Sequence, residues 1–288
     1  MLLPVTEQAP AKLNLYLEIT GKRPDGYHLL DSLVVFTAFS DTLHFYPADE
    51  LSLEVEGDFA GMLKDEQGNI VLKAARALKE HTECRQGARI VLEKRIPVSA
   101  GLGGGSSDAA AALRGLSRLW DVHAAQDMWV PLARRLGSDV SVCLQMQPAI
   151  MRGAGEEVMP IACKVNAWAV MVNPGVPLST AEVYQRFAGD FSKPGDGPAT
   201  DSFDAVLANI SQRRNALEAS AIALCPAIVD TLKTLGGIQG CKLARMAGSG
   251  ATCFGLFEQE KEAEAAADCL GKKYPWVVHT SLYRCQPK

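Results

Sequence analysis

A glycine-rich segment is the part of this chain whose residue types point most directly to chemistry. Residues 101–108 read Gly-Leu-Gly-Gly-Gly-Ser-Ser-Asp, and an alanine run follows at once. Because glycine has no Cβ, backbone N–H groups here can approach a ligand closely. Hydroxyls and a carboxylate before strong helix formers predict a helix start, where N–H groups and the helix dipole favour phosphate. We therefore predict a nucleotide or phosphoester site with Asp108 as helix cap; the alternative is a loop that only joins a strand to a helix.

The two common phosphate loops do not fit this segment. A Walker A loop requires a lysine after its last glycine, and no lysine follows Gly105. The dinucleotide-binding fingerprint requires a third glycine where Ser106 stands. The segment is therefore a phosphate loop of another kind.

The elements around the loop must position it. The apolar, β-branched run at 88–96 predicts a strand before the loop, and a helix with one buried face follows it. Residues 11–19 alternate strictly, which predicts a half-buried strand with Lys12 and Asn14 on its polar face. Further predicted strands cover 29–37, 42–46, 51–55 and 167–172, and predicted helices cover 70–81, 124–136 and 260–273.

This mixture of early strands and later helices predicts an α+β fold. We place the domain boundary near residues 158–166, which gives domains 1–160 and 161–288. A strand, a bend and a second strand are expected over 244–257. The Pro- and Gly-rich loop 191–198 receives no role.

Composition excludes several classes of protein. The chain has 288 residues and a net charge of −4, which argues against a nucleic-acid binder with a broad basic face. We see no signal peptide and no apolar stretch near the ~18 residues that a membrane span needs. The eight cysteines form no CxxC or Cys–His cluster, so we expect reduced thiols, a cytoplasmic protein and no structural zinc.

Three separated segments together resemble the motifs of the GHMP kinases. They are Pro10-Ala-Lys-Leu-Asn-Leu, residues 97–107 and Ala247-Gly-Ser-Gly-Ala. The resemblance covers nearly the whole chain. It implies an α+β, two-layer α/β sandwich in two domains, with the N-terminal domain binding ATP and the active site in the cleft between domains. Within the family, Gly21-Lys-Arg-Pro-Asp-Gly-Tyr-His28 resembles the members that phosphorylate the 2-hydroxyl of 4-diphosphocytidyl-2-C-methylerythritol, in the non-mevalonate isoprenoid pathway.

The resemblance implies a catalytic pair. Asp139 matches the aspartate that accepts the proton of the attacking hydroxyl, and Lys12 matches its electrostatic partner. Asn14 would hydrogen-bond the substrate near that hydroxyl. From the residues alone, Asp139 reads as a helix cap and Lys12 as a solvated strand lysine. Val140 stands where the family usually has proline, which removes some preorganisation but no hydrogen bond.

The resemblance also implies a cytidine site. Tyr27 and Tyr184 would hold the cytosine ring between them, His28 would contact its polar edge, and Thr180 would contact the diphosphate. Without the family, packing near a turn is the preferred explanation of a lone Tyr or His.

ATP and Mg²⁺ are the implied co-substrate and cofactor. The residues implied for ATP are Asn69, Lys94, Pro97, Gly101, Gly103, Gly104, Gly105, Ser106 and Ser107. Gly248, Ser249 and Gly250 would support the phosphate loop, or form a simple hairpin turn. We identify no protein residue as a metal ligand and expect a monomer or homodimer. The open alternatives are a homoserine or mevalonate kinase, whose substrates carry no base to stack, and a nucleotide-binding regulator without catalysis.

Overall fold

The structure is a computed structural model, and it describes residues 4–63, 68–122, 126–162, 166–195, 197 and 202–283. It contains two compact units. The first comprises Met1–Ala11, Ser40–Val98 and Gly103–Met146; the second comprises Lys12–Phe39, Ser99–Leu102 and Gln147–Lys288. Neither unit is continuous in sequence.

Two long strands explain why the units differ from the predicted division at residue 160. The strands β1 (Val5–Lys22) and β2 (His28–Ala48) each contribute to both units. At roughly 3.3 Å per residue, the 18 residues of β1 span roughly 60 Å. The strand is therefore long enough to contribute side chains to the core of each unit. The sequence predicted two strands over 29–46, but no glycine or proline interrupts residues 29–46, and a single strand runs through them.

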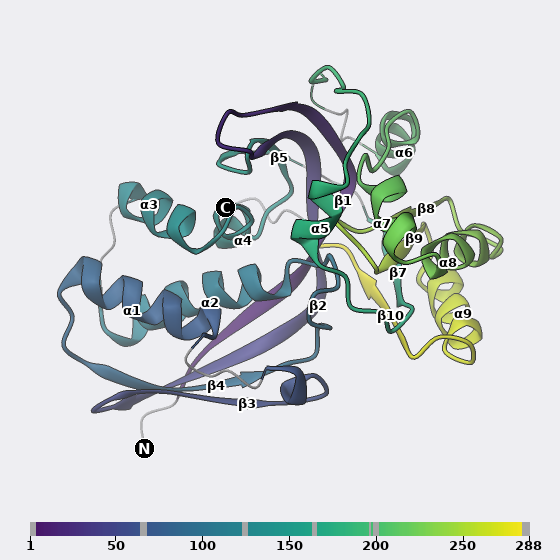
Figure 1. The fold of residues 1–288 in the computed structure, drawn as a ribbon. Helices are drawn as coiled ribbons and strands as arrows, with labels where there is room; N and C mark the ends of the chain where they lie inside the picture. The colour runs from purple at the N-terminus through teal and green to yellow at the C-terminus, as the bar shows by residue number, and fades with distance from the viewer. Residues whose placement is uncertain are drawn as a thin grey trace. The chain divides into compact units, whose positions relative to one another are not determined.

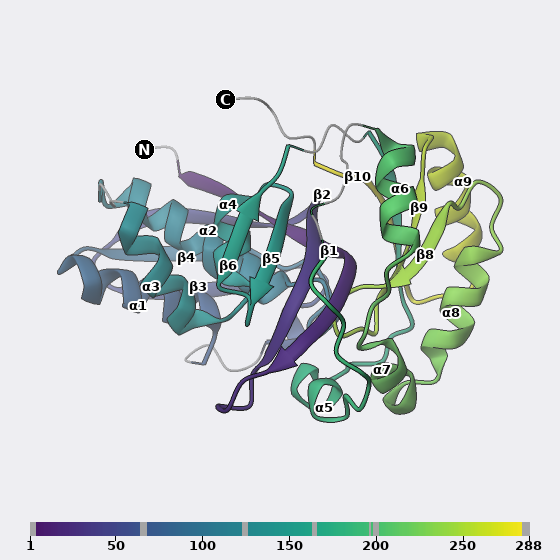
Figure 2. The ribbon, with the colours of Figure 1, turned by 90° about the horizontal axis from the view of Figure 1, so that it is seen from above.

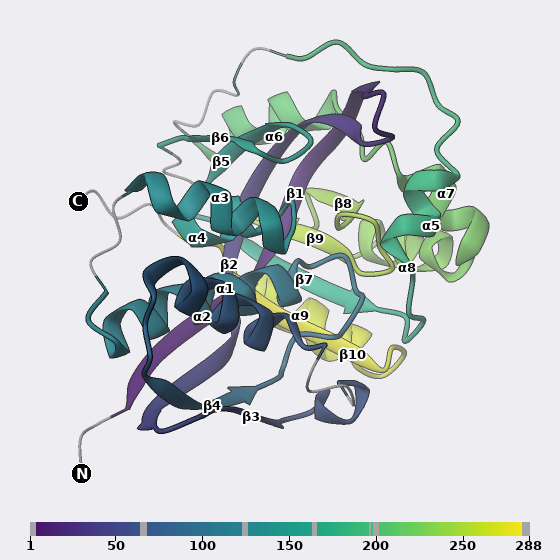
Figure 3. The same cartoon turned by 60° about the vertical axis from the view of Figure 1, so that its left-hand side comes forward.

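The first unit places helices on a small sheet. The strand β3 (Leu51–Glu56) pairs in parallel with β4 (Gly87–Glu93), and β4 pairs antiparallel with Thr42–Ala48 of β2. The described helices of the unit are η1 (Ala60–Met62), α1 (Ile70–Thr82), α2 (Gly104–Leu119), α3 (Gln126–Leu136) and α4 (Val140–Gln145). Figures 1 and 3 show α1 and α2 over this sheet.

The second unit contains an antiparallel sheet, whose strands in order are β10 (Trp276–Ser281), β7 (Trp168–Asn173), β9 (Cys253–Phe257) and β8 (Leu243–Met246). Helices α8 (Ala227–Gly236) and α9 (Glu260–Leu270) contact this sheet and lie on one side of it in Figures 1 and 2. A hairpin of β5 (Ala149–Gly153) and β6 (Glu157–Pro160) adds to residues Leu30–Val34 of β2. The unit also contains the helices α5 (Thr180–Gln185), α6 (Phe203–Ser211) and α7 (Glu218–Leu224).

The polar face of β1 corrects a sequence prediction. Instead of being half-buried, every residue from 9 to 19 of this strand is buried. Later segments cover the face that was expected to meet water: the guanidinium of Arg213 lies 4.3 Å from the ring of Tyr16, and Ser192 hydrogen-bonds Glu18 at 2.7 Å. Among the described residues, no helix is long and apolar enough to cross a bilayer.

Candidate active site

The glycine loop turns into α2 earlier than predicted. Gly103 is the cap residue, with a φ of +66°, and the helix begins at Gly104. Asp108 is therefore inside the helix, and its predicted role as cap is wrong. The first turn contains no acidic side chain, so nothing in that turn offsets the positive end of the dipole of this 16-residue helix. Its first N–H groups have no partner within the helix, as phosphate binding requires.

Ser107 ties this helix start to β1. Its hydroxyl donates to the carbonyl of Pro10 at 2.8 Å, and its N–H donates to the carbonyl of Gly103 at 2.9 Å. The hydroxyl of Ser107 is thus engaged within the protein, whereas Ser106 is only half-buried. Of the two serines, Ser106 is the better placed to offer its hydroxyl to a ligand.

The turn at 247–251 lies against the start of the glycine loop. A Cβ on Gly101 would stand 2.2 Å from the carbonyl oxygen of Ala247, and the φ of Gly101 is +78°. The N–H of Thr252 donates to the carbonyl of Ala100 at 3.3 Å. The turn therefore contacts the start of the glycine loop, and this contact requires glycine at position 101. Support of bound phosphate by Gly248, Ser249 and Gly250 stays a prediction.

Lys94 lies beneath the loop rather than at the surface. Its ammonium is 2.5 Å from a carboxylate oxygen of Asp41 and 2.6 Å from one of Asp108, and all three side chains are at most 3% exposed. Asp41 also accepts the N–H groups of Arg95 and Ile96, at 2.6 and 2.8 Å. The role of Lys94 as an ATP ligand stays a prediction, while its ion pairs give it a structural one.

Two carboxylates share one ammonium in this cluster, so one of them holds a proton more easily. Burial raises the pKa of Asp108 to about 7, although Lys94 opposes the shift. One oxygen of Asp108 has no hydrogen-bond partner, so its charged form receives little stabilisation beyond the ammonium of Lys94, whereas Asp41 also accepts two backbone N–H groups. Burial lowers the pKa of Lys94, but the neighbouring carboxylates of Asp108 and Asp41 outweigh burial and raise it.

Two other residues implied for ATP have structural settings of their own. The side chain of Asn69 accepts the N–H of Val71 at 2.9 Å and so caps α1. Pro97 is buried between β4 and the loop. Contact of either residue with a nucleotide stays a prediction.

Lys12 and Asn14 are buried side by side on β1. The ammonium of Lys12 donates to the amide oxygen of Asn14 at 2.7 Å, and Lys12 is 4% exposed. The amide of Asn14 donates to Ser32 at 2.8 Å, and Ser32 donates to the carbonyl of Tyr16 at 2.6 Å. Lys12 is therefore not on the solvated face that the strand pattern alone predicts, and because burying an ammonium is costly, its contact with Asn14 matters. The catalytic role of Lys12 stays a prediction.

Asp139 directly precedes α4 and is half-buried. Its side chain makes no capping hydrogen bond to that helix, so the capping alternative from the sequence does not describe it. The pairing of Asp139 with Lys12 stays a prediction, because Asp139 belongs to the first unit and Lys12 to the second.

The predicted cytidine residues include one clear ring contact. The rings of His28 and Tyr184 lie 5.5 Å apart, and Tyr27 is 63% exposed at the turn after β1. Burial, followed by the charge of Lys22, lowers the pKa of His28, which favours a neutral ring with one donor and one acceptor. Thr180 and Ser249 share a hydrogen bond of 2.8 Å, which brings the predicted diphosphate residue to the supporting turn.

Sequence reasoning missed Phe187. Its ring meets that of His28 edge-on at 5.7 Å and stacks on Phe191 at 6.2 Å. The available signal was spacing, because a residue three positions after Tyr184 returns to the same side of a helical turn.

Comparison with known proteins gives the family. Residues 69–147 match the GHMP kinases N terminal domain, and residues 202–275 match the GHMP kinases C terminal domain. A 4-diphosphocytidyl-2-C-methyl-D-erythritol kinase of Paramagnetospirillum magneticum is 48% identical, over 96% of this chain and 97% of its own. This chain belongs to the GHMP kinases. The two matched regions of this GHMP kinase lie on either side of the division predicted at residue 160.

Other relatives agree with this assignment. A kinase of the same name from Parvibaculum lavamentivorans is 47% identical over 96% of this chain and 98% of its own. A crystal structure of a 4-(cytidine 5'-diphospho)-2C-methyl-D-erythritol kinase matches with a TM-score of 0.80 and 32% identity, over 96% and 98% of the two chains. A homoserine kinase from Cytophaga hutchinsonii shares the fold at a TM-score of 0.71 and 16% identity, over 97% and 95%. The two-domain α+β fold expected from the motifs is confirmed.

Proposed function

We propose that this GHMP kinase transfers the γ-phosphoryl group of ATP to the 2-hydroxyl of 4-diphosphocytidyl-2-C-methyl-D-erythritol. The observation that carries the proposal is the identity of 44–48% with kinases of that name, nearly all of them over more than nine-tenths of the chain. His28 and Tyr184 support it, because a pyrimidine base needs an aromatic face and a hydrogen-bonding edge. Homoserine and mevalonate contain no base that could contact either residue.

Phosphoryl transfer depends mainly on positioning and on stabilising charge. In this proposal, Asp139 accepts the proton of the attacking hydroxyl as its oxygen bonds to the γ-phosphorus and the bond from that phosphorus to ADP breaks. Lys12, held by Asn14, stabilises negative charge on the transferring group. The N–H groups at the start of α2 hold the phosphates of ATP.

Mg²⁺ enters the proposal together with ATP. Among the described residues, no group of three or more His, Cys, Asp or Glu side chains is arranged to hold a metal ion. In this proposal the magnesium ion is carried on phosphate oxygens of ATP, since Mg²⁺ often keeps few protein ligands. Such an ion would supply positive charge that offsets the negative charge of the phosphate groups. Ser106, which is half-buried at the start of α2, is the residue that we propose would contact the ion.

We also propose the cytoplasm as the location. A reducing compartment keeps thiols out of disulfides, and this supports the proposal. The free thiols include Cys84, Cys225, Cys241, Cys253 and Cys269. Cys163 and Cys285 lie outside the described residues.

The test is ADP release by the purified protein with Mg-ATP and one acceptor at a time: the cytidine substrate, homoserine or mevalonate. We expect release with the cytidine substrate alone. Release with another acceptor would keep the kinase and refute the assigned substrate. Absence of release with all three, from a folded protein that binds ATP, would favour a regulator without catalysis.

A further inference from the structure

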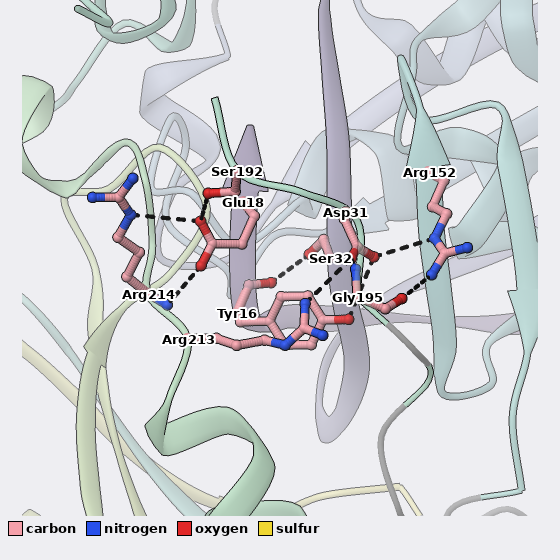
Figure 4. A network of polar contacts seen from close by, with 9 residues as sticks. All are labelled: Tyr16, Glu18, Asp31, Ser32, Arg152, Ser192, Gly195, Arg213 and Arg214. Atoms are coloured by element: carbon pink, nitrogen blue, oxygen red, sulfur yellow. Dashed lines mark hydrogen bonds and ion pairs between the residues drawn. The ribbon is translucent and has the colours of Figure 1, made fainter. Parts of the chain in front are cut away.

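Two buried carboxylates on the β1–β2 hairpin hold a segment that comes from far along the chain. Asp31 is fully buried, and its oxygens accept the N–H of Gly195 at 2.7 Å and the guanidinium groups of Arg152 and Arg213 at 3.3 and 3.2 Å. Figure 4 shows Asp31 at the centre of these contacts. Arg152 in turn donates to the carbonyl of Gly195 at 2.5 Å. Both polar groups of one peptide residue are therefore fixed.

Gly195 fits this position because it has no side chain. An added Cβ would lie 1.6 Å from a terminal nitrogen of Arg213. Arg213 has little freedom to move away, because its guanidinium pairs with Asp31 and lies on the ring of Tyr16. Burial, followed by the charge of Asp31, raises the pKa of Tyr16 to about 12, so its hydroxyl stays a donor to Asp31.

The second anchor is Glu18, whose side chain is 10% exposed. One of its oxygens accepts the hydroxyl of Ser192 at 2.7 Å, and the other accepts the N–H of Arg214 at 3.1 Å (Figure 4). The N–H of Ser192 donates to the carbonyl of Ile19 at 2.8 Å. The segment 186–195, which we call the strap, is thus fixed near its end at two residues.

The strap begins at the aromatic residues of the predicted base site. It follows α5, which carries Tyr184, and its second residue is Phe187, packed edge-on against His28. Phe191, 56% exposed, stacks on Phe187 one residue before the anchor at Ser192. The anchor at Ser192 therefore fixes the backbone directly after Phe191, whose ring stacks on the ring that contacts His28.

We propose that the strap is a wall of the cytidine site in which Phe187 positions the ring of His28, with Asp31 and Glu18 anchoring Phe187. This rests on the proposed function, because it takes a cytosine base as the ligand. A pyrimidine edge offers donors and acceptors in a fixed order, so a histidine distinguishes bases only if its ring is held in one orientation. The ring contacts of Tyr184 and Phe187 together hold it.

The experiment compares the full chain with its Phe187→Ala variant by calorimetry, using cytidine 5′-diphosphate and uridine 5′-diphosphate as probes. Saturating ADP occupies the ATP site, so that the probes report the base site. We expect the variant to bind the cytidine nucleotide about tenfold more weakly, the order of one aromatic pair, and to lose most of its preference for cytidine. KM for ATP should change less than twofold. Phe187→Tyr should restore binding, and Val229→Ala, which removes an exposed apolar side chain elsewhere in the second unit, should have no effect.

The anchors provide a second test. Ser192→Ala removes one hydrogen bond to Glu18 and should weaken cytidine nucleotide binding about two- to threefold, with an unchanged melting temperature. Asp31→Asn should weaken it further, and Phe187→Ala combined with Ser192→Ala should be no weaker than Phe187→Ala alone, because both act through one ring.

Each outcome decides between the strap and the proposed function. Turnover of the cytidine substrate with unaltered nucleotide binding and base preference in Phe187→Ala would overturn the strap and keep the function. Cytidine binding that depends on Phe187, in a protein that does not phosphorylate the substrate, would support the strap and refute the function. Failure of the wild-type chain to bind the cytidine nucleotide would overturn the strap, while ADP release with the cytidine substrate would still decide the function.

Discussion

Replacing Lys94 by Met should destabilise the protein without weakening its affinity for ATP. The substitution removes the ammonium that two carboxylates share, and leaves Asp41 and Asp108 facing each other in a site where neither exceeds 3% exposure. Methionine fills similar space, so the loss is one of charge rather than of volume. The predicted alternative, Lys94 as a nucleotide ligand, would instead raise KM for ATP in a stable protein.

The magnitude follows from what an unpaired buried charge costs. Removing one partner of a buried ion pair typically costs about 3–5 kcal/mol, a large part of a folding free energy of about 5–15 kcal/mol. A loss of about 4 kcal/mol lowers Tm by roughly 10 °C in a protein of this size. The loss should be smaller at pH 5.5 than at pH 8, because Asp108, whose pKa is already raised by burial, takes up a proton and relieves the repulsion.

The assay is urea unfolding at both pH values, with KM for ATP measured in parallel. The double variant Lys94→Met/Asp108→Leu should recover part of the lost stability, since it leaves Asp41 with its two backbone N–H donors. Arg89→Met, which breaks an exposed pair with Glu54, is the matched control and should leave Tm nearly unchanged. A Tm within about 2 °C of wild type together with a tenfold rise in KM for ATP would refute this reasoning.

Substitutions of Asp139, Gly101 and Asp108 provide three further predictions. Asp139→Asn should lower kcat by about 10²–10⁴ while ATP affinity measured by calorimetry is unchanged; wild-type turnover would exclude Asp139 as the base. Gly101→Ala should lower Tm and raise KM for ATP, because its Cβ would lie 2.2 Å from a carbonyl oxygen, whereas Gly105→Ala, with its nearest neighbour at 3.8 Å, should leave Tm unchanged; equal melting curves for the two would contradict the packing argument. Asp108→Asn should flatten the pH dependence of stability: the pKa of Asp108, raised to about 7 by burial, makes the wild type lose stability as pH rises from about 4 to about 7, and unfolding midpoints at pH 5 and pH 7.5 measure whether the variant does so less.

Local patterns predicted what depends on neighbouring residues. The strand at 88–96 became β4 over Gly87–Glu93, and the helix at 70–81 became α1 over Ile70–Thr82. The strand–bend–strand at 244–257 is present as β8 and β9. In each case apolar periodicity and the turn residues beside it agree with the tertiary environment.

Long-range contacts decided what the sequence left open. Asp108 carries every signal of a helix cap, yet its partner is Lys94, 14 positions earlier, and Gly103 begins the helix instead. The alternating pattern of β1 predicted a solvent-exposed polar face. Arg213, which lies far along the chain, instead packs on Tyr16 of that face. These partners lie outside any local sequence pattern. Contacts between distant residues therefore overrode the local preference for a helix cap and for an exposed strand face.

The polar face of β1 shows how such partners organise the second unit. Because alternate side chains of a strand share a face, Lys12, Asn14, Tyr16 and Glu18 form one row, roughly 20 Å long at roughly 3.3 Å per residue. Its first two members form the buried amide–ammonium pair, and its last two contact the network that anchors the strap. One rigid strand therefore sets the distance between the proposed phosphoryl-transfer end and the proposed base end of the substrate. A substitution within the row should consequently affect both ends, whereas one in the strap should affect only the base.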